Sequence, residues 1–401
     1  MIAASVPVQR PAGAKLLVAD RSGGIEHHRR SEFVRLLRAG DLVIANDAAT
    51  LPASLSGRHL PSGRQIEARL AGRDSLATDQ VKSFSAVLFG LGDFRMRTED
   101  RPLPPSVRCG DRLALGPLRA TVVRRLLNHP RLVVLELEGS PREIWAGLAR
   151  HGRPIQYAHV PAPLALWDSW TPIAGPPVAF EPPSAGFVLD WSVVASMAAR
   201  DVGFATITHA AGISSTGDPE LDGLLPFDEP YRIPASTAHA IERTRAQGGR
   251  VVAIGTTVVR ALEHAAGRDG MLRVGEGLAT QRVGASSQLR VVDAILSGTH
   301  EPGTSHYELL RAFTGDQTLA RIDQELNTHA YRTHEFGDSV FLERSVPVVP
   351  KATASLQATR QLVRYRARPL PKPSSLSGKD WGRGLLGPHP AAPACSKTGS
   401  P

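Results

Sequence analysis

The stretch from Arg250 to His264 constrains the fold of this chain more than any other part of its sequence. It begins with Val251–Ile254, a short unbroken apolar run that is typical of a strand buried on both faces. Apolar residues at helical spacing follow at once, so a strand turns into a helix at Gly255, Thr256 and Thr257. Glycine permits a sharp turn, and a threonine at the N-cap can accept hydrogen bonds from first-turn amides. The remaining amides can bind an anion or a hydroxyl group, although most such turns bind nothing.

The rest of the chain, to about residue 348, shows two kinds of pattern. Buried runs such as Asp41–Asn46 and Gly203–Thr208 alternate with amphipathic segments such as Ser31–Ala39 and Ser236–Ala246, which is typical of an α/β domain. Between residues 58 and 139, short alternating runs are separated by Gly, Pro, Asn and Asp, without a helix-length period. We therefore predict an α/β main domain, residues 1–57 and 140–348, with an inserted antiparallel β-barrel domain at residues 58–139.

Two segments lack a regular pattern. Residues 153–183 are rich in proline and contain Trp167 and Trp170, so we expect an extended surface segment without regular structure. Residues 349–401 form a basic, Pro-rich tail in which nine Lys or Arg stand against Asp380 alone, so the tail carries most of the formal charge of +9. We expect this tail to be disordered and solvated, with binding of RNA phosphates as the alternative.

The usual cofactor motifs are missing. The chain has no G-x-G-x-x-G after a strand, no G-x-x-x-x-G-K-[ST], no H-E-x-x-H and no cysteine pairs. A Rossmann methyltransferase, a nucleotide triphosphatase and a zinc hydrolase are therefore poorly supported, and we expect no metal. The N-terminus has no signal-type apolar region and no run approaches membrane-spanning length, so we predict a cytoplasmic protein without membrane contact. The sequence leaves the oligomeric state open.

What remains is a set of polar and glycine residues at predicted strand ends and turns. Each can have a structural role instead of a functional one: Asn46 and Asp47 can cap a turn, and His209 can be a satisfied buried histidine rather than an acid or base. Arg260 can pair with a nearby glutamate instead of binding an anion. The candidates are Asn46, Asp47, Ser184, Gly186, His209, Glu229, Gly255, Thr256, Thr257, Arg260, His300 and Asp338.

The order of these groups along the chain resembles the S-adenosylmethionine:tRNA ribosyltransferase-isomerase family of queuosine biosynthesis. The most specific block is Gly-Thr-Thr-Val-Val-Arg-Ala-Leu-Glu at residues 255–263. The resemblance spans Ile2 to Leu342, with the β insertion where the family has its barrel. Other residues that carry it are Gly40–Asp47, Gly63–Glu67, Val178 and Ala179, Ser184–Gly186, Thr208 and His209, Glu229, Val292–Leu296, His300 with Pro302, Ala312 and Phe313, and Phe336–Asp338.

The resemblance implies an enzyme that uses S-adenosylmethionine as co-substrate. The family transfers and rearranges its ribosyl part onto 7-aminomethyl-7-deazaguanine in the tRNA anticodon, giving epoxyqueuosine, adenine and methionine. Such a site must deprotonate a group next to the sulfonium, hold the amino acid part and protonate departing adenine. The implied roles are acid-base work for His209 or His300, contacts to polar or anionic ligand groups for Thr256, Thr257 and Arg260, and a carboxylate facing a cation for Asp47 or Asp338.

Several positions depart from the family pattern. Where the family has a histidine this chain has Val188, an arginine is replaced by Ala49, and an asparagine by Gly298. The glycines after His209 are also lost in place, with Gly212 shifted by one. We therefore keep two alternatives: a diverged paralogue that uses S-adenosylmethionine on another nucleoside or small acceptor, and a non-catalytic RNA-binding protein that uses the basic tail.

Overall fold

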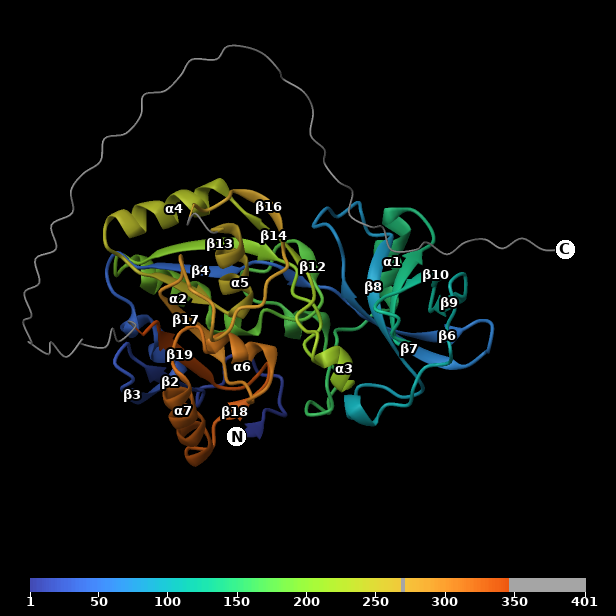
Figure 1. Ribbon diagram of the computed structural model, residues 1–401, viewed down its shortest axis with the longest axis horizontal. Coiled ribbons are helices and arrows are strands. Elements are labelled where there is room, and N and C mark those ends of the chain that lie inside the picture. Colours follow the sequence, from blue (N-terminus) through green and yellow to red (C-terminus); the bar gives the residue numbers. More distant parts are fainter. Residues whose placement is uncertain (268–270, 346–401) are drawn as a thin grey trace, which may run out of the picture. The chain divides into compact units, whose positions relative to one another are not determined.

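The computed structural model describes residues 1–267 and 271–345. The predicted tail, residues 349–401, lies outside the described residues. The described part contains a nine-stranded mixed sheet with helices and a closed six-stranded barrel. The predicted fold class, an α/β main domain with an inserted antiparallel β-barrel, is therefore confirmed (Figure 1).

Strand β4 (Leu42–Asn46) lies inside the large sheet and is buried along its whole length. It pairs in parallel with β13 on one side and with β15 on the other, which explains the unbroken apolar runs in the sequence. In spatial order the strands are β16 (Gly275–Ala279), β14 (Glu229–Ile233), β13 (Gly203–His209), β4 (Leu42–Asn46), β15 (Val251–Ile254), β17 (Ala294–Gly298), β19 (Ser339–Glu343), β2 (Lys15–Ala19) and β3 (Ile25–Arg29).

Helices cover both faces of this sheet. Because alternate side chains of a strand point to opposite faces, Ile44 packs in one core and its neighbours Val43 and Ala45 pack in the other. The first core includes α4 (Ala235–Ala246), α5 (Thr256–Ala265), α6 (Ser305–Leu310) and α7 (Asp316–Thr328). The second includes the 3₁₀ helices η1 (Arg30–Leu36) and η4 (Ser184–Val188), together with α2 (Trp191–Ala198).

The amphipathic segment Ser31–Ala39, which was predicted to be a helix, forms most of η1, a 3₁₀ helix of seven residues. The residues that bound it, Arg29 and Leu37, are both extended, and the Glu32 carboxylate accepts a hydrogen bond from the Arg29 amide. The helical segment is therefore short, and 3₁₀ helices are typically short.

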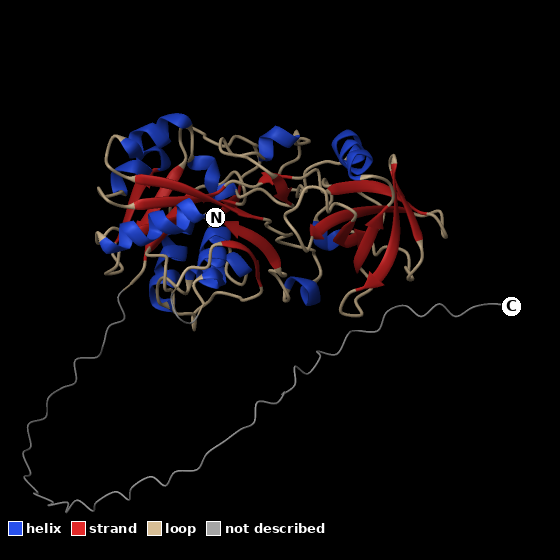
Figure 2. Cartoon of the chain, turned by 90° about the horizontal axis from the view of Figure 1, so that it is seen from above, coloured by secondary structure: helices blue, strands red, loops and turns tan. Residues whose placement is uncertain are grey.

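The barrel strands are antiparallel and close in the order β10-β11-β8-β7-β6-β9. Figure 2 shows the barrel strands as the red group on the right. They are β6 (Ser54–His59), β7 (Gln65–Gly72), β8 (Ser83–Phe89), β9 (Arg112–Leu115), β10 (Leu118–Arg125) and β11 (Leu132–Leu137). Strand β6 begins at Ser54, before residue 58, where the predicted insertion starts. A Cβ atom at Gly57 would lie 2.1 Å from the Ala114 carbonyl oxygen, so the close approach of β9 requires glycine there.

Helix α1 (Pro141–His151) follows the barrel and packs on it through Ile144 and Leu148. Its start is a capping box, in which the Ser140 hydroxyl accepts from the Glu143 amide and the Glu143 carboxylate accepts from the Ser140 amide. The remaining short elements are β1 (Ile2–Ala3), β5 (Ala49–Thr50), η2 (Thr98–Asp100), η3 (Leu166–Ser169), β12 (Pro177–Ala179), α3 (Pro219–Asp222) and β18 (Arg332–Thr333).

The Pro-rich segment 153–183 differs from its prediction. It contains η3 and β12, and Ile155, Phe180 and Glu181 are buried, although Trp167 is exposed. The expectation of a surface segment was wrong because strand β12 pairs with β5 and carries Phe180 into the barrel core. A run of prolines says little about burial when the neighbouring backbone is paired.

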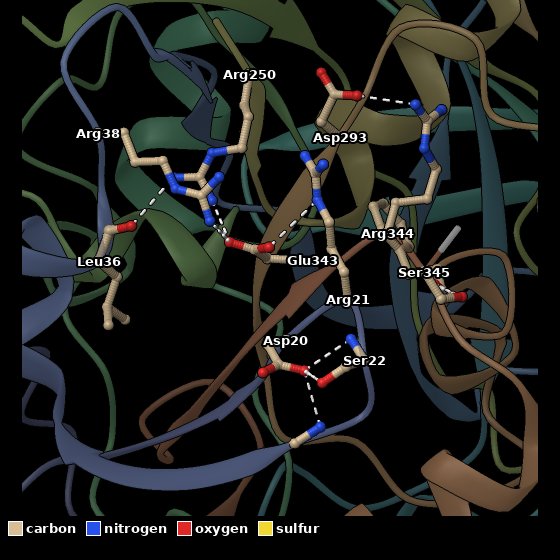
Figure 3. Close-up of polar contacts among 12 residues, drawn as sticks. Asp20, Arg21, Ser22, Leu36, Arg38, Arg250, Asp293, Glu343, Arg344 and Ser345 are labelled. Atoms are coloured by element: carbon tan, nitrogen blue, oxygen red, sulfur yellow. Dashed lines mark hydrogen bonds and ion pairs between the residues drawn. The ribbon is translucent and has the colours of Figure 1, made fainter. Parts of the chain in front are cut away.

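An ionic cluster ties together the strand ends opposite the carboxyl ends of β4 and β15. The Arg250 guanidinium donates to the carboxylates of Asp41 and Glu343, and Arg38 donates to Glu343 at 2.9 Å. Figure 3 shows Arg21, Arg38 and Arg250 pointing toward Glu343. Because Arg250 is buried and paired, this cluster holds β4, β15 and β19 in register rather than exposing a free charge.

Candidate functional site

A pocket with a cavity volume of about 100 Å³ lies where the chain leaves the carboxyl ends of β13, β15 and β17. This is the edge at which open α/β sheets commonly bind ligands. Residues from six short segments of the chain line it: residues 181–185; residues 211–214; residues 226 and 229; residues 255–257 and 260; residues 297, 298 and 300; and residues 305, 306 and 309. Of the candidate residues from the sequence, the pocket brings together Ser184, Glu229, Gly255, Thr256, Thr257, Arg260 and His300.

The N-terminus of α5 forms one wall of the pocket. A threonine was expected at its N-cap, but the N-cap is Gly255, and no side chain caps the helix. Gly255 has φ of 92°, a conformation that residues other than glycine rarely adopt, so the turn itself selects glycine. Thr256 is thus the first helical residue. The uncapped first-turn amides are donors that an anionic group in the pocket can accept from.

Arg260 and Glu229 form a buried ion pair beside this turn, with exposed fractions of only 4% and 7%. The Arg260 guanidinium also donates to the carbonyls of Phe227, Ala279 and Gln281 at 2.7, 2.7 and 3.0 Å. Burial raises the pKa of Glu229, whereas Arg260 and the Gly212 amide favour its charged form. With most of its donors bound to protein, Arg260 shapes the pocket wall, and binding of a substrate anion by Arg260 stays a prediction.

His209 lies behind the pocket rather than on its surface. Its side chain is fully buried, its Nε2 is 3.4 Å from the Glu229 carboxylate, and neither ring nitrogen has a hydrogen-bond partner among the described residues. Burial and then the charge of Arg260 lower its pKa to about 3, so the ring is neutral. Asn46 holds the His209 backbone, accepting from its amide and donating to its carbonyl at 2.9 Å each. Both residues support the pocket from behind, and their predicted direct roles stay untested.

His300 is the candidate acid-base residue that lines the pocket. Its Nε2 is 3.1 Å from the Ser297 hydroxyl, and its ring stacks on His306 with 4.7 Å between centroids. Burial, followed by the charges of His306 and His334, lowers its pKa well below the ordinary value. A neutral imidazole at a pocket surface can accept a proton from a bound molecule.

Besides His209 and Asn46, three further candidates do not line the pocket, and each has a contact that explains its position. Asp47 accepts from the hydroxyls of Thr206 and Thr208, at 2.9 and 2.7 Å, and so links β4 to β13. Asp338 accepts from two backbone amides at 2.8 Å. Gly186 is buried, and a Cβ atom there would lie 2.9 Å from the Thr171 methyl group. The geometry of all three points to structural roles.

The sequence interpretation missed Glu181, Tyr157, Ser214 and His306. Glu181 and Ser214 line the pocket, and the Tyr157 hydroxyl donates to Glu181 at 2.5 Å. Burial raises the pKa of Glu181 to about 7 despite opposing hydrogen bonds from Ser214 and Tyr157. One signal was available: Glu181 is the only charged residue between Trp170 and Asp190, and a lone carboxylate in an apolar run is a candidate for burial.

Within the described ranges, one group of side chains is close enough to share a metal ion. The ligand atoms of His27, Glu325 and His329 lie within 4.8 Å of one another, on β3 and at the end of α7. None of the three residues lines the pocket, so this group supplies no metal ligand to the candidate site. Among residues 1–267 and 271–345, no helix combines the length and apolarity that crossing a membrane requires.

Residues 1–342 match the model of a family described as queuosine biosynthesis protein. The match covers the sheet, the barrel and every residue of the pocket. The chain therefore belongs to this family, and the resemblance read from the Gly-Thr-Thr block is confirmed.

Curated relatives carry the name of an enzyme. The S-adenosylmethionine:tRNA ribosyltransferase-isomerase of Sorangium cellulosum is 33% identical over 84% of this chain and 94% of its own length. That of Pelobacter propionicus is 31% identical over 85% and 96%. A crystal structure of S-adenosylmethionine tRNA ribosyltransferase from Thermotoga maritima is similar at 22% identity over 85% and 96%, with a TM-score of 0.45. The prediction of a transferase-isomerase of queuosine biosynthesis is confirmed at this level.

Proposed function

We propose that this protein transfers and isomerises the ribosyl moiety of S-adenosylmethionine onto 7-aminomethyl-7-deazaguanine in tRNA, giving epoxyqueuosine. The observation that carries the proposal is that the family match, residues 1–342, contains the whole pocket with its Gly255-Thr256-Thr257 turn. S-adenosylmethionine is the co-substrate, tRNA is the partner, no step is assigned to a metal, and the protein works in the cytoplasm.

Three features of the pocket suit this chemistry. The uncapped first-turn amides of α5 are placed to donate hydrogen bonds to the carboxylate of the methionine part. Neutral His300 is placed to remove the proton next to the sulfonium. The buried pair of Glu229 and Arg260 keeps the wall rigid, so the reacting groups meet in a fixed geometry.

The first experiment is a calorimetric titration of S-adenosylmethionine into the protein, followed by chromatography for released adenine. Adenine release that depends on tRNA carrying the deazaguanine precursor supports the proposal. His300→Gln should bind S-adenosylmethionine but slow release by about 100-fold or more, the usual contribution of a general base. Asp47→Asn is the matched control, because Asp47 does not line the pocket. Equal effects of the two substitutions would contradict the role of His300.

A diverged acceptor is the second candidate function, and one departure from the family pattern favours it. Gly298 lines the pocket and leaves it without a side chain there, whereas Val188 and Ala49 are buried in the fold. A pocket widened at Gly298 admits another nucleoside or small acceptor. Binding of S-adenosylmethionine without tRNA-dependent release of adenine, but with release on adding free nucleosides, would favour this candidate.

The basic tail is a candidate for part of the tRNA contact. Deleting residues 349–401 removes nine Lys or Arg and one Asp, so tRNA binding through the tail predicts weaker binding and a shallower dependence on salt. If the shortened protein binds tRNA with unchanged affinity and salt dependence, the contact lies in the body.

A further inference from the structure

Two buried carboxyl groups, Glu181 and Glu229, line the pocket, and the half-buried Glu335 acts electrostatically on Glu181. The three differ in their partners. Glu229 is paired with Arg260, and Glu335 with His159 at 2.9 Å. Glu181 lines the pocket and is 8% exposed. No Lys, Arg or His of the described ranges lies within ion-pair distance of it. An unpaired charge is costly in such a place, so the neutral acid is favoured.

The contacts of Tyr157 fit a protonated Glu181. The Tyr157 hydroxyl oxygen lies 2.5 Å from the Glu181 carboxyl and 3.2 Å from the Ser215 carbonyl oxygen. A phenol has one hydrogen to donate. If it goes to Glu181, the Ser215 carbonyl lacks this donor; if Glu181 carries a proton of its own, it donates to Tyr157 and Tyr157 donates to Ser215. The same geometry therefore holds Glu181 with or without its proton.

The charged groups facing Glu181 act in opposite directions. The negative charge of Glu335 raises the pKa of Glu181, in addition to the larger effect of burial. The positive charge of Arg69 favours the carboxylate form of Glu181, but Arg69 interacts more strongly with Glu67, to which its guanidinium is bound. The Ser214 hydroxyl and amide also favour the carboxylate form, and Glu181 titrates near neutral pH as a result.

The pocket thus holds a carboxylic acid that can keep its proton and an imidazole, His300, that stays without one. Groups whose surroundings push their pKa values in such opposite directions are typical acid and base partners. We propose that Glu181 is the catalytic acid that protonates the departing adenine, while His300 takes the proton next to the sulfonium. This inference rests on the proposed function.

The step balances in protons and electrons. As the glycosidic C–N bond breaks, its electron pair stays with adenine, and the Glu181 O–H proton is transferred to a ring nitrogen of the base. A lone pair of the ribose ring oxygen stabilises the carbon that loses adenine as an oxocarbenium ion, whose positive charge balances the carboxylate formed. Adenine leaves neutral and Glu181 is left as a carboxylate. Tyr157 then donates its hydrogen bond to that carboxylate, which regains a proton from solvent through the open pocket before the next turnover.

The test combines a substitution with altered leaving groups. Glu181→Gln should slow adenine release from S-adenosylmethionine by 100- to 10,000-fold, the range of general acid catalysis. Analogues with 1-deazaadenine, 3-deazaadenine or 7-deazaadenine lack one ring nitrogen each. The analogue that lacks the accepting nitrogen should react slowly with both proteins, so the effect of Glu181→Gln should largely disappear. An effect of the same size with all four substrates would overturn the proposal.

A matched control and a second measurement separate the possible failures. Glu343→Gln removes another buried carboxylate, in the ionic cluster away from the pocket, and should leave the dependence on the leaving group unchanged. Infrared difference spectra of the substrate-free protein should show, just below the pKa of about 7, a protonated carboxyl band that Glu181→Gln removes. Active wild-type protein without this band overturns the acid role alone. Wild-type protein that releases no adenine under any condition overturns the proposed function, and the acid role with it.

Discussion

Removing the guanidinium of Arg260 should destabilise the protein strongly, because its partner Glu229 would be left buried without a counter-charge. Arg260→Met keeps the apolar part of the side chain and deletes the charged group. Breaking a buried ion pair from one side costs about 3–5 kcal/mol. The carbonyls of Phe227, Ala279 and Gln281 lose their donor in the same step.

The penalty should also depend on pH. Without Arg260 the pKa of Glu229 rises further above its unfolded value, so the folded variant binds a proton more tightly than the unfolded chain does. That contribution is fully present below the unfolded pKa of Glu229 and is lost as the pH rises through the folded pKa. Arg260→Met should therefore lose more stability at alkaline than at mildly acidic pH.

The assay is urea denaturation followed by circular dichroism, on wild type, Arg260→Met, Glu229→Gln and the double variant. The double variant should lose less free energy of unfolding than the two single losses together, by about 1–3 kcal/mol. Arg311→Met is the control, since its pair with Asp316 is exposed and should matter little. Additive losses, or a loss below about 1 kcal/mol for Arg260→Met, would refute the structural pair and leave Arg260 free to bind substrate.

Three further predictions concern single residues. Burial raises the folded pKa of Glu181 to about 7, so protonated Glu181 stabilises the fold below its unfolded pKa, and this stabilisation is lost as the pH rises through about 7. In urea denaturation, Glu181→Gln should reduce the change in the free energy of unfolding over this pH range by up to about 3 kcal/mol. For His209, whose folded pKa is about 3, the free energy of unfolding falls as the pH drops below the unfolded pKa of about 6.5. His209→Gln should reduce this fall by up to about 5 kcal/mol, and acid unfolding identical to that of the wild type would contradict the prediction. Gly255→Ala and Gly248→Ala both place alanine at positive φ, so each should lower the free energy of unfolding by about 1–3 kcal/mol. Only Gly255 lines the pocket, so only Gly255→Ala should lose adenine release, and equal activities of the two variants would argue against the turn as part of the site.

The local pattern of the sequence was sufficient for the main elements of the fold. The buried run Val251–Ile254, the glycine after it and the amphipathic helix are properties of neighbouring residues, and they form as predicted because strand and helix periodicities are set locally. The alternating runs likewise indicated the barrel, except for β6, which begins before the predicted insertion. The Gly-Thr-Thr block also indicated the family.

Only the tertiary structure decided which polar groups face a pocket and which hold the fold together. Asp47 and Glu181 look equally suited to chemistry in the sequence, but Asp47 is bonded to hydroxyls of β13 while Glu181 opens into the pocket. The deciding partners lie far along the chain: Arg260 is 31 residues from Glu229, and Asn46 is 163 from His209. The charge, pKa and accessibility of a buried group depend on the groups that packing places around it, and no local pattern contains that information.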